Sequence, residues 1–284
     1  MSRRQSSSQL PFAIGLPALI WQVLFFYLPL AIIVLSSVIA VSDRGYFSGF
    51  TFEKIGFFCN ALYFKVIASS LLLGLSNALI CFLIAFPLAY LIAFSSSLKK
   101  NLLLFLLIVP FWTNFLLHVY AWFFVLEKQG FLNQLLQWIH LIDHPTSLLN
   151  TPIAIMIMMV YYYLPFMVIP LYSSLERMDR RLIEASYDLG ASWTQSLSRV
   201  ILPLTKKGVK AGFFLVYIPS FGEFAIPELM GGDRYMFVGS VVASYILGDE
   251  TGSLGAAFTV LASMCLIASA IALYYLIDKL IPGE

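Results

Sequence analysis

Six long apolar runs constrain this chain more than any other feature of its sequence. Crossing a hydrocarbon core about 30 Å thick requires roughly 20 apolar residues in an α-helix, and each run is long enough. The runs are continuous and do not alternate with period two, so they predict helices and exclude the strands of a membrane barrel. The predicted spans are Phe12–Val41, Leu62–Phe94, Leu102–Leu126, Pro152–Leu175, Val209–Met230 and Leu254–Ile277.

The composition also indicates a chain that lies in a bilayer. Hydrophobic residues make up 60% of the sequence and charged residues 11%, whereas charged residues make up about a quarter of an ordinary soluble domain. The first apolar run follows Arg3 and Arg4 but is too long for a secretion signal, and it lacks a convincing small-residue cleavage site. We therefore expect this run to be retained as a span.

The distribution of Lys and Arg predicts the orientation, because basic residues are retained on the cytoplasmic side of a membrane. With both termini in the cytoplasm, twelve of the 17 Lys and Arg residues fall inside. The same assignment places a loop at residues 176–208 in the cytoplasm, between the fourth and fifth spans. The expected organisation is a cytoplasmic tail at 1–11, a six-helix membrane domain at 12–278 and a cytoplasmic tail at 279–284.

The sequence offers no motif for catalysis or metal binding. Its three cysteines are widely separated, and its three histidines lack the HExxH spacing of a zinc hydrolase. It contains no phosphate-binding loop of the form GxxxxGK followed by Ser or Thr, and no His pair, Ser–His pair or carboxylate dyad at convincing depth. We expect a non-enzymatic chain that binds no cofactor or metal, and whose energy comes from another protein.

The stretch RRLIEASYDLGASWTQSLSRVILPL, residues 180–204, interrupts the apolar pattern. In its first ten residues, apolar positions interleave with Glu184 and Asp188, which lie one turn apart, so a short amphipathic helix is predicted. Gly190 supplies the positive φ that commonly closes a helix. A second helix is expected at Ala191–Val200, with Pro203 interrupting it.

Two short helices at an angle would form a protrusion in the cytoplasm. It has an apolar face and no partner within its own loop, which favours docking to a soluble protein. The alternative is a helix that lies on the membrane surface.

This loop resembles the EAA loop of ABC-importer permeases. The motif of that family reads E-A-A, three residues, G, nine residues, I, one residue, L-P, and the chain departs from it at Ser186 and Val200. In that family the loop carries a coupling helix that seats in a groove of the cytoplasmic ATPase subunit. The resemblance implies that role for Glu184, Ala185, Ser186, Asp188, Gly190, Leu202 and Pro203.

Three further blocks are similar to the spermidine/putrescine permeases of the PotB/PotH-like family. They are VPFWTNFLLHVYAW at Val109–Trp122, YLPFMVIPLYSSLERMD at Tyr163–Asp179 and IPSFGEFAIPELMGG at Ile218–Gly232. This resemblance covers essentially the whole chain beyond the first span. It implies an all-α integral membrane protein with six transmembrane helices, the type I ABC-importer permease fold and a cytoplasmic coupling helix.

The implied machine is a polyamine importer of the bacterial inner membrane. Its partners would be a dimer of cytoplasmic ATPase subunits that hold ATP and Mg, a second permease subunit, expected to be a homologous different chain, and an extracytoplasmic substrate-binding protein. Two alternatives stay open at this point. The cargo could be another small solute, because the EAA loop does not specify it, or the chain could be a stand-alone cation channel or carrier.

A path for a polyamine needs aromatic faces and a few carboxylates in place of water. Trp112 lies about ten residues into the third span, or roughly 15 Å from its cytoplasmic end at 1.5 Å per residue. The fourth span places Tyr161, Tyr162 and Tyr163 at similar depth. The candidate path residues are Trp112, Asn114, Tyr120, Tyr161, Tyr162, Tyr217 and Glu223. Packing between helices is the alternative role of the aromatic residues.

Glu223 is the strongest candidate for contact with an ammonium group. It lies in an apolar span and is flanked by Pro219, Gly222 and Pro227, which can break the helix and expose backbone groups to a cavity. An interfacial glutamate near the outer end of the span is the alternative. Glu228 and Asp233 are expected at the outer mouth, in contact with substrate or binding protein.

Overall fold

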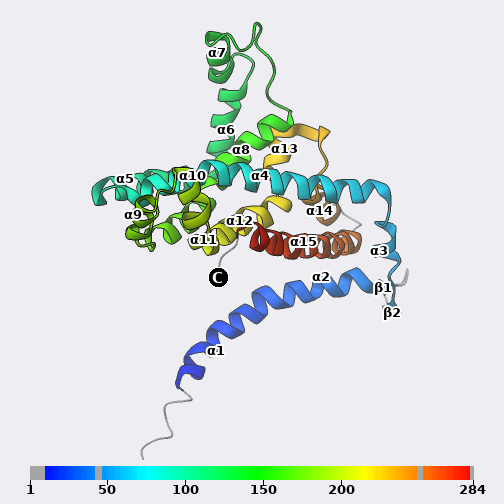
Figure 1. The fold of residues 1–284 in the computed structure, drawn as a ribbon. Coiled ribbons are helices and arrows are strands. Elements are labelled where there is room, and N and C mark those ends of the chain that lie inside the picture. Colours follow the sequence, from blue (N-terminus) through cyan, green and yellow to red (C-terminus); the bar gives the residue numbers. More distant parts are fainter. Residues whose placement is uncertain (1–9, 42–46, 248–251, 282–284) are drawn as a thin grey trace, which may run out of the picture. The chain divides into compact units, whose positions relative to one another are not determined.

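The computed structural model describes residues 10–41, 47–247 and 252–281. Arg3, Arg4 and nearly all of the predicted tail at 1–11 lie outside the described residues, as do residues 282–284 of the predicted C-terminal tail. The chain is mostly helical, and it divides into two compact units (Figure 1). The first unit comprises Met1–Phe64 and Val241–Met264, and the second comprises Lys65–Ser240 and Cys265–Glu284.

The first unit begins with a long apolar helical segment. Its elements are α1 (Leu10–Gln22), η1 (Val23–Tyr27), α2 (Leu28–Val38), β1 (Ile39–Val41), β2 (Phe47–Phe50) and α3 (Glu53–Phe57). Strands β1 and β2 pair antiparallel. Lys54 of α3 closes the C-terminal end of α2, because its Nζ donates to the carbonyl oxygens of Ser36 and Ile39 at 3.2 and 2.7 Å.

Three helices pass from one unit to the other: α4 (Ala61–Phe94), α14 (Val238–Leu247) and α15 (Gly252–Leu280). Within the first unit, Phe58 is fully buried among aromatic rings that these helices supply. Its ring centroid lies 4.7 Å from that of Tyr63 and 5.0 Å from that of Phe258. The hydroxyls of Tyr63 and Tyr245 are 2.8 Å apart and share a hydrogen bond.

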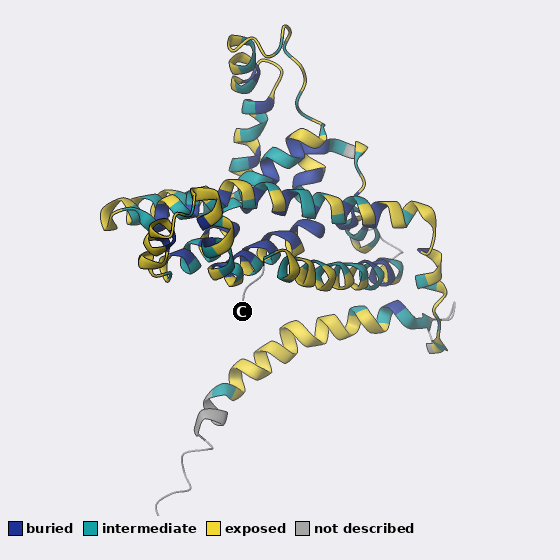
Figure 2. Ribbon diagram, in the orientation of Figure 1, coloured by how far each residue is buried: buried dark blue, intermediate teal, exposed yellow. Residues whose placement is uncertain are grey.

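The second unit holds the core and all of the predicted site. Its elements are α5 (Ser97–Ile108), η2 (Val109–Trp112), α6 (Phe115–Leu126), α7 (Phe131–Trp138), α8 (Pro152–Glu176), α9 (Arg180–Asp188), α10 (Trp193–Ser196), η3 (Leu197–Ile201), α11 (Leu202–Leu204), α12 (Lys206–Phe221), α13 (Ala225–Gly231) and η4 (Gly232–Arg234). Buried residues concentrate on α8 and α12 (Figure 2). Two glycines of α12 permit this packing, since a Cβ on Gly208 would lie 2.7 Å from the Pro170 carbonyl oxygen and one on Gly212 would lie 2.8 Å from Met167 Sδ.

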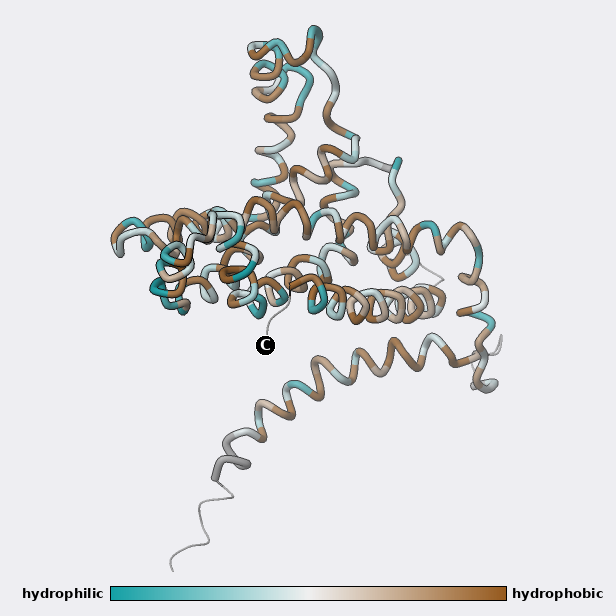
Figure 3. The backbone as a smooth tube through the Cα atoms, in the orientation of Figure 1, coloured by the Kyte–Doolittle hydropathy of each residue, from teal (hydrophilic) through white to brown (hydrophobic). Residues whose placement is uncertain are grey.

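The predicted spans correspond to apolar helices of the structure. Among the described residues, four single helical segments are long and apolar enough to cross a membrane: Gly15–Val38, Ala61–Phe94, Pro152–Glu176 and Gly252–Leu280. Two bent pairs, Ser97–Trp112 with Phe115–Trp138 and Lys206–Phe221 with Ala225–Gly231, bring the number to six if each pair is one span. Apolar residues dominate these segments, whereas α9 is more polar (Figure 3).

The first predicted span extends three residues too far. Its helix ends at Val38, and Ile39–Val41 form β1 instead. The β-branched residues of that stretch suit a strand, and β2 supplies the partner that a strand needs.

The third predicted span is wrong as a continuous helix. The helices on either side of Thr113 and Asn114 meet at 98°. Pro110 has no backbone N–H and therefore removes one hydrogen bond from the helix. Asn114 then caps a new helix, because its side-chain oxygen accepts from the Leu116 N–H at 2.8 Å. Trp112 therefore lies at a sharp break, so its depth cannot be counted along a straight helix.

Pro203 does not interrupt the helix that precedes it, which corrects a third expectation. The chain passes without a break from α10 through the π-helical segment η3 into α11, and the Leu202 N–H bonds to the Leu197 carbonyl five residues back. Proline removes one N–H and clashes with the carbonyl four residues earlier, and the wider π turn accommodates both effects. The π-helical segment η1 accommodates Pro29 in the same way, because the Leu28 N–H bonds to the Val23 carbonyl five residues back.

Candidate functional site: the loop between α8 and α12 and a broken helix

The loop between α8 and α12 folds as two helices at an angle. Asp179 caps α9, its carboxylate accepting from the Arg181 N–H at 3.0 Å. Gly190 ends α9 with a φ of +81°, as the sequence predicted. Ser192 and Gln195 form a reciprocal capping box at the start of α10.

A buried hydroxyl pair joins the two helices of the loop. Ser186 Oγ on α9 lies 2.7 Å from Ser196 Oγ on α10, and it also donates to the Ile183 carbonyl at 2.7 Å. Ser186, Ser196 and Ile183 are all buried. Buried hydroxyls with satisfied hydrogen bonds fix relative orientation, because separating them leaves polar atoms without partners. The protrusion is therefore built as one rigid piece.

The protrusion is anchored to the end of α4. The Arg180 guanidinium donates to the Ala93 carbonyl at 3.3 Å and lies 4.8 Å from the centroid of the Phe94 ring. On the other side, the rings of Trp193 and Tyr90 meet edge to face at 5.2 Å. A cation over an aromatic ring and an edge-to-face pair each contribute roughly 0.5–1.5 kcal/mol.

The solvent-facing side of the protrusion carries apolar side chains that no other part of the described chain covers. Leu189 is 89% exposed, and Leu182 and Tyr187 are also exposed. Three of the predicted coupling residues, Glu184, Ala185 and Asp188, also lie exposed on α9, beside these apolar side chains. Leu202 and Pro203 are half-buried in α11, at the base of the protrusion. An exposed apolar cluster on a rigid, capped support is typical of a docking surface.

The fifth predicted span breaks where the sequence indicated. Helix α12 ends at Phe221, α13 begins at Ala225, and the two meet at 64°. Glu223 lies in the break, and its Oε1 accepts from the N–H groups of Ala225 and Ile226 at 3.1 and 3.4 Å. The carboxylate thus satisfies backbone donors at the start of α13.

The second oxygen of Glu223 is held by a tyrosine from another helix. The Tyr163 hydroxyl, on α8, donates to Glu223 Oε2 at 2.7 Å. A chain of aromatic contacts leads away from this bond, since the Tyr163 ring lies 5.5 Å from that of Tyr162, and the Tyr162 ring lies 5.6 Å from that of Phe111 in η2. Two neighbouring tyrosines of α8 therefore link the break between α12 and α13 to η2, which precedes the break in the third span.

The other predicted path residues are dispersed within the second unit. Trp112 is 75% exposed, and Tyr120 is exposed on α6. Asn114 uses its side-chain oxygen as the cap of α6. The Tyr161 ring lies 5.6 Å from His118 and 5.4 Å from Trp122.

Tyr217 is placed as a packing residue would be. It is 1% exposed, its hydroxyl shares a 2.8 Å hydrogen bond with Ser269, and its ring stacks on Phe213. Of the two outer-mouth candidates, Glu228 is exposed in the first turn of α13. Asp233 lies in η4, and its side chain is outside the described residues. The part of the chain that the structure describes contains no cluster of His, Cys, Asp and Glu suited to a metal ion.

Tyr163 is absent from the path residues predicted from the sequence, although it makes the most direct contact with Glu223. A usable signal existed: Tyr163 falls four residues from both Met159 and Met167, on the buried face of α8. A tyrosine on a buried face needs an acceptor for its hydroxyl, and Glu223 is the acid that the sequence offers within an apolar span.

Known proteins resemble this chain over most of its length. Residues 55–281 match the family described as "Binding-protein-dependent transport system inner membrane component". The spermidine/putrescine transport system permease protein PotB of Salmonella typhimurium is 40% identical over 241 residues, covering 84% of this chain and 84% of that protein. PotB of Haemophilus influenzae is 38% identical over 263 residues, covering 92% of this chain and 91% of that protein.

A solved structure shares the fold at low sequence identity. It is the bacterial alginate ABC transporter in complex with an alginate pentasaccharide-bound periplasmic protein, with a TM-score of 0.71, 16% identity, and coverage of 97% of this chain and 96% of that one. Fold and relatives together define a multi-pass, non-catalytic permease with the type I ABC-importer architecture. The chain belongs to the family of binding-protein-dependent transport system inner membrane components.

Proposed function

We propose that this permease imports polyamines, spermidine or putrescine, which an extracytoplasmic binding protein delivers. The observation that supports polyamines as the substrate is the 40% identity to a spermidine/putrescine permease over 241 residues. The Tyr163–Glu223 pair supports it, because a carboxylate among aromatic rings suits an ammonium group. A carboxylate offers about four acceptor positions, so Glu223 keeps room for a cation beside its three present donors.

The driving force in this proposal comes from cytoplasmic ATPase subunits that bind ATP and Mg. The protrusion formed by α9, α10, η3 and α11 would seat in such a subunit through Leu189 and its exposed neighbours. The proposal places both termini in the cytoplasm, as the basic residues favour. It includes a second, homologous but different permease chain that completes the translocation path.

Uptake measurements in cells test the cargo. Labelled putrescine and spermidine should enter cells that carry this subunit and not cells that lack it. Glu223→Gln should reduce uptake about tenfold or more, since a hydrogen bond to a charged group is worth roughly 1.5–3 kcal/mol. Trp112→Ala should also reduce uptake, because it removes an aromatic face for the ammonium groups. Glu53→Gln, which alters an exposed acid of the first unit, is the matched control. Uptake of neither amine by wild-type cells would refute the polyamine assignment.

Energy coupling is tested separately in vesicles that contain the assembled transporter. Removing ATP should abolish uptake. Polyamine flux through this chain alone, with no ATPase present, would instead support a channel or carrier and would contradict the proposal.

A further inference from the structure

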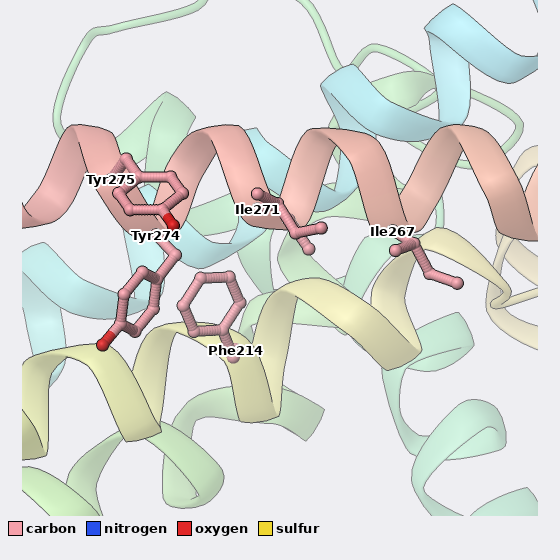
Figure 4. Close-up of a pocket in the computed structure, with 6 residues that line it drawn as sticks. Phe214, Ile267, Ile271, Tyr274 and Tyr275 are labelled. Carbon is pink, nitrogen blue, oxygen red and sulfur yellow. The ribbon is translucent and has the colours of Figure 1, made fainter.

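An apolar groove runs between α12 and the C-terminal half of α15, within the second unit. Its volume is about 340 Å³. Figure 4 shows Phe214 and Tyr274 lying between the two helices, with Ile267 and Ile271 along α15. These α15 side chains are exposed, and Ile267 is 58% and Ile271 54% accessible. The groove is therefore open along its length to whatever surrounds the helices.

Basic side chains gather at one end of this groove. Lys210 Nζ lies 3.8 Å from the centroid of the Tyr274 ring, which forms the groove wall. Lys210 and Lys206 both pair with Asp278 Oδ1, at 2.5 and 2.6 Å. A single carboxylate is thus paired with two lysines, so the start of α12 and the end of α15 keep a net positive charge.

Two further lysines extend the basic end. Lys207 precedes Phe214 by seven residues and Lys279 follows Tyr275 by four, spacings that place each on the groove side of its helix. Both lysines are exposed. Within the described residues, this end of the groove therefore carries four lysines and one aspartate.

We propose that this groove binds an anionic phospholipid, with an acyl chain along Ile267, Ile271 and Phe214 and the phosphate at Lys207 and Lys279. The pattern of an open apolar channel ending in cations matches an amphiphile with a negative headgroup. An apolar transmembrane helix would fill the groove but offers no anion to the lysines at its end. A zwitterionic lipid would satisfy the apolar part but not the surplus of positive charge. The proposal rests on membership of a membrane-protein family and is independent of the cargo.

Native mass spectrometry of the full-length chain in detergent tests the site. Equal amounts of dioleoyl phosphatidylglycerol and dioleoyl phosphatidylcholine would be added, so that the two lipids differ only in headgroup. The wild-type chain should retain phosphatidylglycerol preferentially. Each lysine near an anionic lipid contributes a factor of about five in affinity, so Lys207→Gln with Lys279→Gln should lower that preference about twenty-five-fold.

Two more variants separate this site from general surface charge. Lys99→Gln with Lys128→Gln removes the same charge elsewhere and should leave the preference unchanged. Ile271→Trp fills the groove from an exposed wall position and should release both lipids, with an unchanged circular dichroism spectrum showing that the chain is folded. An exposed position is chosen because a buried one would disturb packing.

Three results would overturn the proposal. An equal loss of phosphatidylglycerol in the Lys99 and Lys128 control would show that binding is not localised. Retention of phosphatidylglycerol by Ile271→Trp would exclude the groove. The third result concerns the assembled transporter. If substituting Lys207 and Lys279 there does not change the amount of bound phosphatidylglycerol, a protein subunit covers this face instead.

Discussion

The Tyr163 hydroxyl and the Glu223 carboxylate are joined by a 2.7 Å hydrogen bond that ties α8 to the break between α12 and α13. The other Glu223 oxygen holds the first N–H groups of α13. One side chain therefore fixes the angle of a broken helix and connects it to its neighbour.

Tyr163→Phe should weaken this joint. Leaving a partly buried charged acceptor without its donor costs about 1–3 kcal/mol, so the thermal unfolding midpoint of the purified chain should fall by several degrees. Tyr162→Phe, one residue away, is the matched control, and it should leave the midpoint close to wild type. Equal midpoints for the two variants would contradict a structural role for the bond.

The Ser186–Ser196 pair should behave as one unit. Ser186→Ala and Ser196→Ala should each loosen the protrusion by about 1–3 kcal/mol, because each leaves a buried hydroxyl unpaired, whereas the double variant should lose less than the sum. Limited proteolysis between α9 and α10 measures the loosening. Strictly additive effects would show that the two hydroxyls do not interact.

Leu189→Glu should prevent the proposed docking of an ATPase subunit without affecting folding. The residue is 89% exposed, so its replacement disturbs no internal packing, while a charge would oppose an apolar contact. Co-purification of the ATPase measures the effect. Leu98→Glu is a close control, since Leu98 is 86% exposed at the start of α5, and its variant should retain the ATPase.

Gly208→Val should destabilise the contact between α8 and α12. The first added carbon would lie 2.7 Å from the Pro170 carbonyl oxygen, a backbone atom that cannot move aside, and overpacking of this kind costs about 1–3 kcal/mol. Ala211→Val in the same helix is the control, because Ala211 is exposed. The yield of folded chain after solubilisation distinguishes the two, and an equal yield would contradict close packing.

The apolar runs predict most of the fold because bilayer thickness limits the length of a spanning helix. Breaks within spans were only partly predictable. Pro219 and Gly222 flank Glu223 closely enough to indicate the bend of the fifth span. In the third span Pro110 indicates a kink at most, and the 98° break also depends on Asn114 capping α6.

The candidate site shows the same limit. Spacing identifies Gly190 and the amphipathic pattern of α9, because both are local properties. The partner of Glu223 comes from α8, 60 residues earlier in the sequence, and no local pattern specifies such a contact. The prediction for Pro203 was wrong because it applied a local rule, that proline interrupts a helix, whereas a π turn accommodates this proline.

The path from α10 through η3 and α11 to α12, in which Thr205 (φ −95°, ψ 5°) departs from helical geometry, also limits changes of length. Thr205, the residue between α11 and α12, keeps the ladder intact, its N–H bonding to the Ile201 carbonyl and its carbonyl accepting from Val209, both at 3.0 Å. Inserting one residue here would turn everything beyond it by about 100°. Phe214 and Glu223 would then face the wrong neighbours. Evolution can vary the side chains of this stretch far more readily than it can add or remove a residue.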